Sequence, residues 1–182
     1  CAFSIFANPG DVIMSCTIPT GGHISHSKKA LGGTAGYIRE LEVNNYPFDE
    51  ENFTIDIDKT AQVVRDLKDQ GKSPKLFVLG ASVFLFPHPV KEIVQLAKGV
   101  GAKVMYDGAH VAGLIAGGIF QDPLGEGADV FTMSTHKTLA GPQHGAITSK
   151  LEYADRIKRA IFPGLSSNHH LHAVAGVAIA FA

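Results

Sequence analysis

The stretch Ala128-Asp129-Val130-Phe131-Thr132-Met133-Ser134-Thr135-His136-Lys137-Thr138-Leu139-Ala140-Gly141-Pro142 gives the first indication of the fold and of its chemistry. Its first half is a short apolar run, which predicts a buried strand. Its second half places Lys137 just beyond that strand, before Gly141 and Pro142 turn the chain. Ligands of open α/β sheets bind at such strand ends. We therefore expect Lys137 to be a partly desolvated amine, which can form a Schiff base with an aldehyde.

A second strand end carries an acid. The run Lys103-Val104-Met105-Tyr106-Asp107 is again short and apolar, and His110 follows shortly after the aspartate. One interpretation is a helix cap with a histidine in the first helical turn. The other is a cofactor site, in which the lysine binds the aldehyde of a pyridoxal ring and the aspartate keeps the ring nitrogen protonated. The protonated ring then acts as an electron sink.

Alternating strands and helices predict the fold class. This order is typical of an α/β protein with a mostly parallel mixed sheet between two helical layers, a three-layer αβα arrangement. Right-handed crossovers bring the strand ends to one edge of the sheet, where Asp107, Ser82 and Lys137 should meet. The expected strands cover residues 11–18, 35–43, 75–79, 103–107, 128–133 and 145–148. The expected helices cover residues 56–70, 90–99, 111–118, 151–161 and 173–182. Residues 44–53 are expected to form a loop.

Composition narrows the class of protein. The chain has 182 residues, 45% of them hydrophobic, and a net charge of −1, which indicates an ordinary globular protein with a real core. It lacks the basic excess that nucleic acid or an anionic membrane surface attracts. Cys1 and Cys16 are too few for a disulfide framework, which fits a reducing cytoplasm. No apolar run is long enough for a membrane span, and no signal peptide is recognisable.

The two ends of the chain suggest a fragment of a longer polypeptide. The chain begins with Cys1 rather than Met, and residues 173–182 form an apolar helical segment without a stop signal. Ser167 and Asn168 are expected to cap that helix.

Three ordered motifs resemble the serine hydroxymethyltransferase family, whose members are pyridoxal-phosphate enzymes of fold type I. The motifs are Gly21-Gly22-His23-Ile24-Ser25-His26, the segment 107–114 and the segment 134–142, with shorter matches at residues 8–11 and 162–164. The resemblance covers nearly the whole chain. It implies that residues 1–182 are part of the cofactor-binding large domain, without the family's N-terminal segment and small C-terminal domain.

The resemblance also implies roles for single residues. Lys137 holds the cofactor, Asp107 contacts its ring nitrogen, and His23 lies flat on the ring, an arrangement that offset stacking favours. His136, beside the lysine, contacts the phosphate. Ser82 takes the place of a serine near the ring hydroxyl.

His110 matches a histidine that lies near the ring and the substrate. The implied reaction is Cα–Cβ cleavage of serine to glycine, with transfer of the one-carbon unit to tetrahydrofolate by a homodimer. The fragment alone is expected to be inactive.

Two other functions stay open. One is a folate-independent pyridoxal-phosphate aldolase or transaldolase with threonine-like substrates. The chain departs from the family pattern at Val83-Phe84-Leu85-Phe86-Pro87-His88-Pro89, at Gln143-His144-Gly145 and at Leu165-Ser166-Ser167-Asn168, and these departures bear on folate more than on pyridoxal phosphate. The other is a non-catalytic module of the same fold, which is less favoured because the lysine, the aspartate and the stacking histidine are all present.

The nine histidines raise the question of a metal. The densest group is His169-His170-Leu171-His172, but it contains no cysteine and its spacing matches no metal-binding signature. The sequence therefore predicts no metal site.

Overall fold

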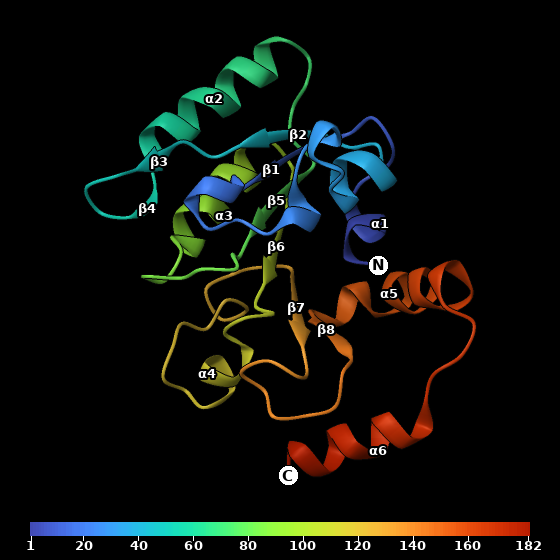
Figure 1. Cartoon of the computed structure of the whole chain (residues 1–182). Coiled ribbons are helices and arrows are strands. Elements are labelled where there is room, and N and C mark those ends of the chain that lie inside the picture. Colours follow the sequence, from blue (N-terminus) through green and yellow to red (C-terminus); the bar gives the residue numbers. More distant parts are fainter.

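A six-stranded sheet runs through the centre of the computed structural model, which describes all 182 residues (Figure 1). The strand order is β2-β1-β5-β6-β7-β8. Neighbouring strands are parallel except for β7 and β8, which are antiparallel. The strands are β1 (Val12–Ser15), β2 (Glu42–Asn45), β5 (Leu76–Leu79), β6 (Lys103–Asp107), β7 (Val130–Ser134) and β8 (Gly145–Ser149). The predicted mostly parallel mixed sheet is confirmed.

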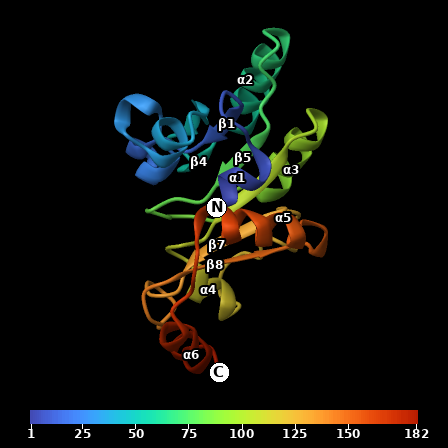
Figure 2. The ribbon, with the colours of Figure 1, turned by 90° about the vertical axis from the view of Figure 1, so that its right-hand side faces the viewer.

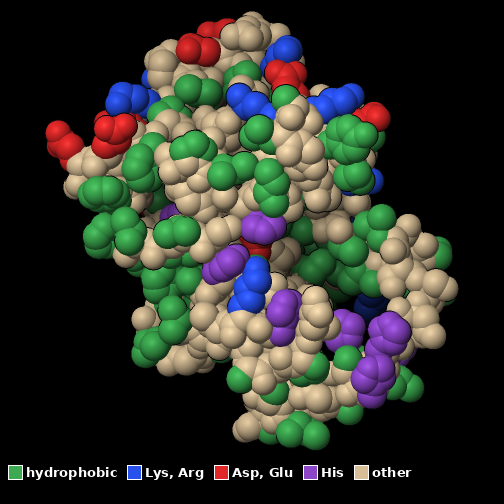
Figure 3. Space-filling model, in the orientation of Figure 1, with side chains coloured by type: hydrophobic (Ala, Val, Ile, Leu, Met, Phe, Trp, Pro, Cys, Tyr) green, Lys and Arg blue, Asp and Glu red, His purple; other side chains and the backbone are tan.

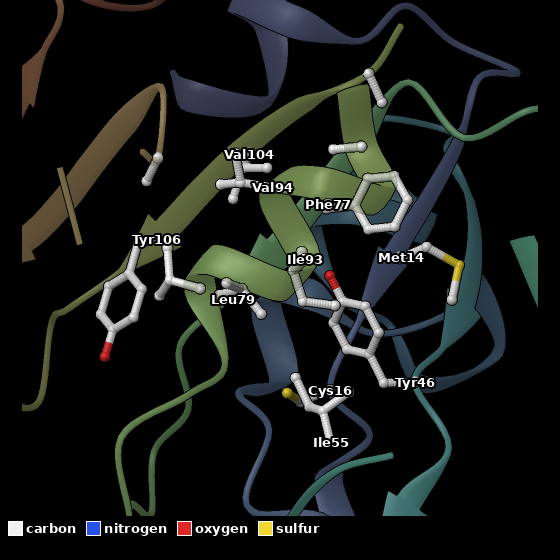
Figure 4. Packing of buried hydrophobic residues seen from close by; sticks show 14 of the residues in the cluster. Met14, Cys16, Tyr46, Ile55, Phe77, Leu79, Ile93, Val94, Val104 and Tyr106 are labelled. Atoms are coloured by element: carbon white, nitrogen blue, oxygen red, sulfur yellow. The ribbon is translucent and has the colours of Figure 1, made fainter. Parts of the chain in front are cut away.

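The middle strands have a continuous apolar sequence because both faces of the sheet are covered. All four residues of β1 and all four of β5 are buried. Two separate clusters of buried side chains lie on opposite faces of the sheet. Figure 4 shows part of the larger cluster, where Ile93 and Val94 of α3 (Val90–Gly99) lie near Leu79 and Val104 of the sheet.

The helices form the two outer layers. The larger cluster includes residues from α2 (Ile57–Asp69), α3 and α4 (Ala112–Ala116), whereas the smaller one includes residues from α1 (Ala2–Phe6). Figure 2 looks onto α1 and α5 (Ala154–Arg159), which lie in front of the strands. The predicted three-layer arrangement is confirmed. The last helix, α6 (Leu171–Ala180), lies at the lower end in Figures 1 and 2, beside the loop that contains Gly141 and Pro142.

A buried carboxylate links one outer layer to the sheet. Asp129 precedes β7, and its Oδ2 accepts the backbone N–H of Val104 at 2.9 Å. Its Oδ1 accepts the hydroxyl of Tyr153, just before α5, at 2.8 Å. These contacts satisfy an acid that is only 8% exposed and hold the start of α5 against the sheet.

Helix α2 follows its sequence signals closely. The Asp56 carboxylate accepts the N–H of Lys59 at 2.9 Å and so caps the first turn. Gly71, with φ of 73°, lies just beyond the last turn, a position that favours glycine. Helix α3 spans the residues predicted for it.

The strand predicted over residues 35–43 is wrong in its first half. Thr34–Ile38 forms one turn of π-helix, and β2 begins only at Glu42. In that turn Ala35 is buried, but Tyr37 and Ile38 are 57% and 64% exposed. The run is apolar, but its side chains do not alternate between core and solvent as those of a strand do.

Two further predictions are corrected. Part of the predicted loop 44–53 is ordered, because β2 continues to Asn45 and a small antiparallel pair forms from β3 (Phe48–Asp49) and β4 (Thr54–Ile55). The predicted cap of the last helix is also wrong, since α6 starts at Leu171 without a side-chain cap. Asn168 instead accepts the N–H of His169 and, through its carbonyl, the hydroxyl of Ser166, so this segment bonds locally before the helix begins.

None of the helices combines the length and the hydropathy that crossing a membrane requires.

Candidate active site

The ends of β6 and β7 form one wall of a small hollow. Strand pairing sets Asp107 of β6 beside Thr132 of β7, and Lys137 follows the end of β7 closely in sequence. The hollow has a volume of about 190 Å³ and is lined by His23, Ser25, Asp107, Ala109, Thr132, Met133, Ser134 and Lys137. Figure 3 shows histidine and basic side chains, the latter coloured alike for Lys and Arg, around the middle of the visible face, with an acidic side chain deeper between them. The predicted lysine and aspartate thus line the same hollow.

Asp107 sits at the floor of this hollow with both oxygens engaged. Oδ2 is 2.9 Å from Nε2 of His26, and Oδ1 accepts the N–H of Ala109 at 3.1 Å. Burial by itself raises the pKa of Asp107, but the interaction with His26, the Ala109 N–H and the nearby Thr132 hydroxyl outweigh it, so the pKa is lowered from its usual value. The carboxylate is therefore ionised at neutral pH.

His26 is a partner of Asp107 that the sequence motifs do not predict. It belongs to a short 3-10 helix, Ile24–His26, and is only 2% exposed. The sequence does contain a hint, since His26 follows His23 by three positions in the glycine-rich motif. Its contact with Asp107 joins segments far apart in the chain, and no local pattern reveals that.

Lys137 and His110 form a direct contact, with 2.9 Å between Nζ and Nε2. A lysine ammonium can only donate, so Nε2 of His110 is the acceptor. Burial first and the Lys137 charge second lower the pKa of His110, while Asp107 acts in the opposite sense. Lys137 itself is exposed, which corrects the expectation of a partly desolvated amine: the hollow is open to solvent on the lysine side.

His23 lines the wall of the hollow between these groups. Its Nδ1 accepts the N–H of Ser25 at 3.2 Å and lies 2.7 Å from the Ser25 hydroxyl. Its ring centre is 6.3 Å from that of His110. Burial and then the neighbouring His26 lower the pKa of His23, so the ring is neutral at pH 7.

Three predicted site residues do not line the hollow: His110, which contacts Lys137, and also Ser82 and His136. Ser82 is half-buried, and its backbone N–H donates to the carbonyl of Gly21 at 2.7 Å, but its side chain does not line the hollow. His136 is exposed, does not line it either, and its side chain makes no hydrogen bond within the chain. Their contacts with a cofactor stay predictions.

The unusually apolar segment after Ser82 lines a different hollow. Residues 83–86 border an apolar space of about 350 Å³, together with residues such as Ile18 and Phe53. His88 fixes the end of this segment, because its Nδ1 accepts the N–H of Gly80 at 3.2 Å. Burial lowers the pKa of His88 to about 4, so the ring is neutral and has a structural role in the loop.

The histidine-rich C-terminal segment does not assemble a metal site. The rings of His144 and His170 lie 6.3 Å apart and those of His170 and His172 5.7 Å apart. Nowhere in the chain do three or more potential ligand side chains converge as a metal ion requires. The structure therefore gives the metal alternative no support.

The donor set of the hollow fits one small aromatic ring that carries an aldehyde. An amine lies on the open side, an ionised carboxylate on the floor and a neutral imidazole on the wall. Its volume of about 190 Å³ is below the roughly 300–1,000 Å³ typical for drug-sized ligands, so a single substituted ring suits it better than a dinucleotide. Pyridoxal has the complementary groups.

Comparison with known proteins gives a consistent result. The family model described as "Serine hydroxymethyltransferase" matches residues 1–182. Proteins of that name from Cenarchaeum symbiosum and Nitrosopumilus maritimus are each 56% identical, over 98% and 99% of this chain. One from Archaeoglobus fulgidus is 50% identical over 98% of the chain. The chain spans 41% of the length of the first two relatives and 39% of the third.

Proposed function

Because this chain belongs to the serine hydroxymethyltransferase family, we propose that the protein containing it is a pyridoxal-phosphate enzyme that converts serine to glycine and passes the one-carbon unit to tetrahydrofolate. Residues 1–182 are part of its cofactor-binding domain. The observation that carries the proposal is the shared hollow, which has Lys137 and Asp107 in its lining.

Bound pyridoxal phosphate supplies an electron-withdrawing ring that stabilises the carbanion left on the amino acid when its Cα–Cβ bond breaks. Asp107 would keep the ring nitrogen protonated, which this stabilisation requires, because the carboxylate is ionised and mostly buried, with a side chain 18% exposed. A negative charge in such surroundings interacts more strongly than one in water.

Lys137 and His110 are placed to exchange the proton of the lysine amine that would bind the aldehyde. The lysine attacks only without its extra proton. His110 is neutral and accepts from Nζ at 2.9 Å, so it is placed to take that proton. The same contact would let His110 return the proton to Nζ of Lys137.

His23 provides one face of the binding site. A neutral imidazole can stack on a pyridine ring without the repulsion that a second cation would bring. We keep two further contacts as part of the proposal, His136 with the phosphate and Ser82 with the ring hydroxyl.

The whole protein is proposed to be a cytoplasmic homodimer, as the family resemblance implies. Cys1 and Cys16 are both free thiols, which is consistent with a reducing compartment.

The direct test is glycine formation from serine by the full-length protein, with and without tetrahydrofolate. The proposal predicts rapid conversion that depends on the folate. Equal rates without folate, or cleavage of threonine-like substrates only, would instead identify a folate-independent aldolase. If the full-length protein lacks the absorbance band of lysine-bound pyridoxal phosphate, it is a non-catalytic module.

A further inference from the structure

His26 is a buried titratable side chain in direct contact with the site. Its ring is 2% exposed and its Nε2 lies 2.9 Å from Oδ2 of Asp107. It does not line the hollow that contains Lys137. It lines a second hollow of about 430 Å³, on which Asp107 also borders. In the lining of the first hollow, His26 contacts the Asp107 carboxylate through Nε2, and its ring meets that of His23 edge-on, with centres 5.9 Å apart.

The surroundings of His26 fix its position. Its backbone carbonyl accepts the hydroxyl of Ser15, the last residue of β1, at 3.1 Å. The next residue, Ser27, closes the turn by donating its hydroxyl to the carbonyl of Ile24 at 2.7 Å. The ring of Phe3 meets the imidazole edge-on, with centres 5.9 Å apart. Contacts with the sheet and with α1 thus fix the position of the imidazole.

The proton on His26 must be on Nε2. A carboxylate can only accept, so the ring nitrogen facing Asp107 has to donate. The other nitrogen, Nδ1, is buried and has no partner. A second proton there would be a buried donor without an acceptor, which is costly. The hydrogen bond from the Nε2–H to Asp107 is therefore the only one that the buried imidazole makes.

Asp107 gains a defined orientation from this contact. A carboxylate at a strand end rotates about its last torsion, which is broad. Here the imidazole fixes one oxygen and the Ala109 N–H fixes the other. We propose that His26 is a positioning residue, which holds the Asp107 carboxylate in the orientation that meets the ring nitrogen of the cofactor. This inference rests on the proposed function.

A matched pair of variants tests the donor itself. His26→Gln and His26→Met introduce side chains of nearly equal length, but only glutamine can donate to Asp107. In the full-length holoenzyme, His26→Met should weaken pyridoxal phosphate binding about tenfold or more, as expected for loss of a hydrogen bond to a charged group. It should also move the pH midpoint of the visible absorbance band. His26→Gln should restore most of both properties.

A purely structural role predicts a different pattern. If His26 only fills space, both variants lower the unfolding temperature but leave the pH midpoint at the wild-type value, and this result overturns the inference. Should the methionine variant not fold, His26→Asn replaces it, because its shorter amide keeps polarity without reaching the Nε2 position.

A double-mutant cycle separates action through Asp107 from other effects. In an Asp107→Asn background, replacing His26 should change cofactor affinity by less than about twofold. An undiminished effect would show that His26 does not act through the carboxylate. The wild type is the control for the proposed function. If the wild type lacks the absorbance band of lysine-bound pyridoxal phosphate, the proposed function is wrong. If the wild type has the band and the variants behave like it, only the role of His26 is refuted.

Discussion

Replacing Asp107 with Asn gives the most informative perturbation of the site. Asparagine keeps the shape of the side chain and an oxygen for the Ala109 N–H, which Oδ1 now accepts at 3.1 Å. It removes the charge. With that oxygen kept for Ala109, the amide N–H₂ would face Nε2 of His26, which now lies 2.9 Å from Oδ2. In the proposed function, the main loss is therefore the negative charge that would support the proton on the ring nitrogen of the cofactor.

The size of the effect follows from burial. The Asp107 side chain is 18% exposed, so the surroundings are intermediate between water and a dry interior. Two unit charges about 4 Å apart interact by about 4 kcal/mol at the effective dielectric constant of such a site. Measured shifts beside an opposite charge are about 1–3 pKa units, or roughly 1.4–4 kcal/mol. We expect kcat to fall roughly ten- to a thousandfold.

The assay is glycine formation from serine and tetrahydrofolate at saturating pyridoxal phosphate, with cofactor occupancy checked by absorbance. The unfolding temperature of the cofactor-free variant controls for misfolding. A kcat within about twofold of the wild type at equal occupancy would refute the assignment, because the carboxylate would then contribute almost nothing.

Two other substitutions probe the surroundings of this site. His110→Ala should lower kcat about a hundredfold, since it removes the proton acceptor of Lys137. Burial and then Lys137 lower the pKa of His110 below its ordinary 6.5. Wild-type activity should therefore be complete at pH 7 and fall as the pH drops through that pKa. The pH–rate profile of the variant should lack this acidic decline. Gly80→Ala should lower the free energy of unfolding by more than about 2 kcal/mol in urea titrations, because Gly80 has φ of 100° and a Cβ there would collide with the Asp107 backbone. Gly71→Ala is the matched control, with φ of 73° and open space around it, and should cost only about 1 kcal/mol; equal losses would argue against close packing behind Asp107.

The predictable parts of the fold are those specified by neighbouring residues. Helix α2 has its cap at Asp56 and its glycine at Gly71, so its bounds follow from the sequence. The strand before Asp107 was predictable because burial on both faces leaves an unbroken apolar run. The strand predicted over residues 35–43 is wrong in its first half because the apolar side chains there include Tyr37 and Ile38, which face solvent. Hydrophobicity alone does not show which side chains the tertiary structure buries.

The same distinction applies to the site. Lys137 and Asp107 were predicted because each follows an apolar strand, and parallel strands end at a common edge. The partner of Asp107, His26, was not predicted because their contact spans distant parts of the chain. The exposure of Lys137 to solvent could not be predicted from the sequence either, since it depends on which side chains pack beside the lysine.

In the proposed function, Lys137 binds the aldehyde of pyridoxal phosphate while Asp107 faces the same ring. The most direct measurement is the visible absorbance of the full-length protein with pyridoxal phosphate, in the wild type and in Lys137→Ala, followed by borohydride reduction and peptide mapping. We predict a band in the wild type, its loss in the variant, and a reduced pyridoxyl group on Lys137. A band that persists in Lys137→Ala, or a pyridoxyl group on another lysine, would contradict the account.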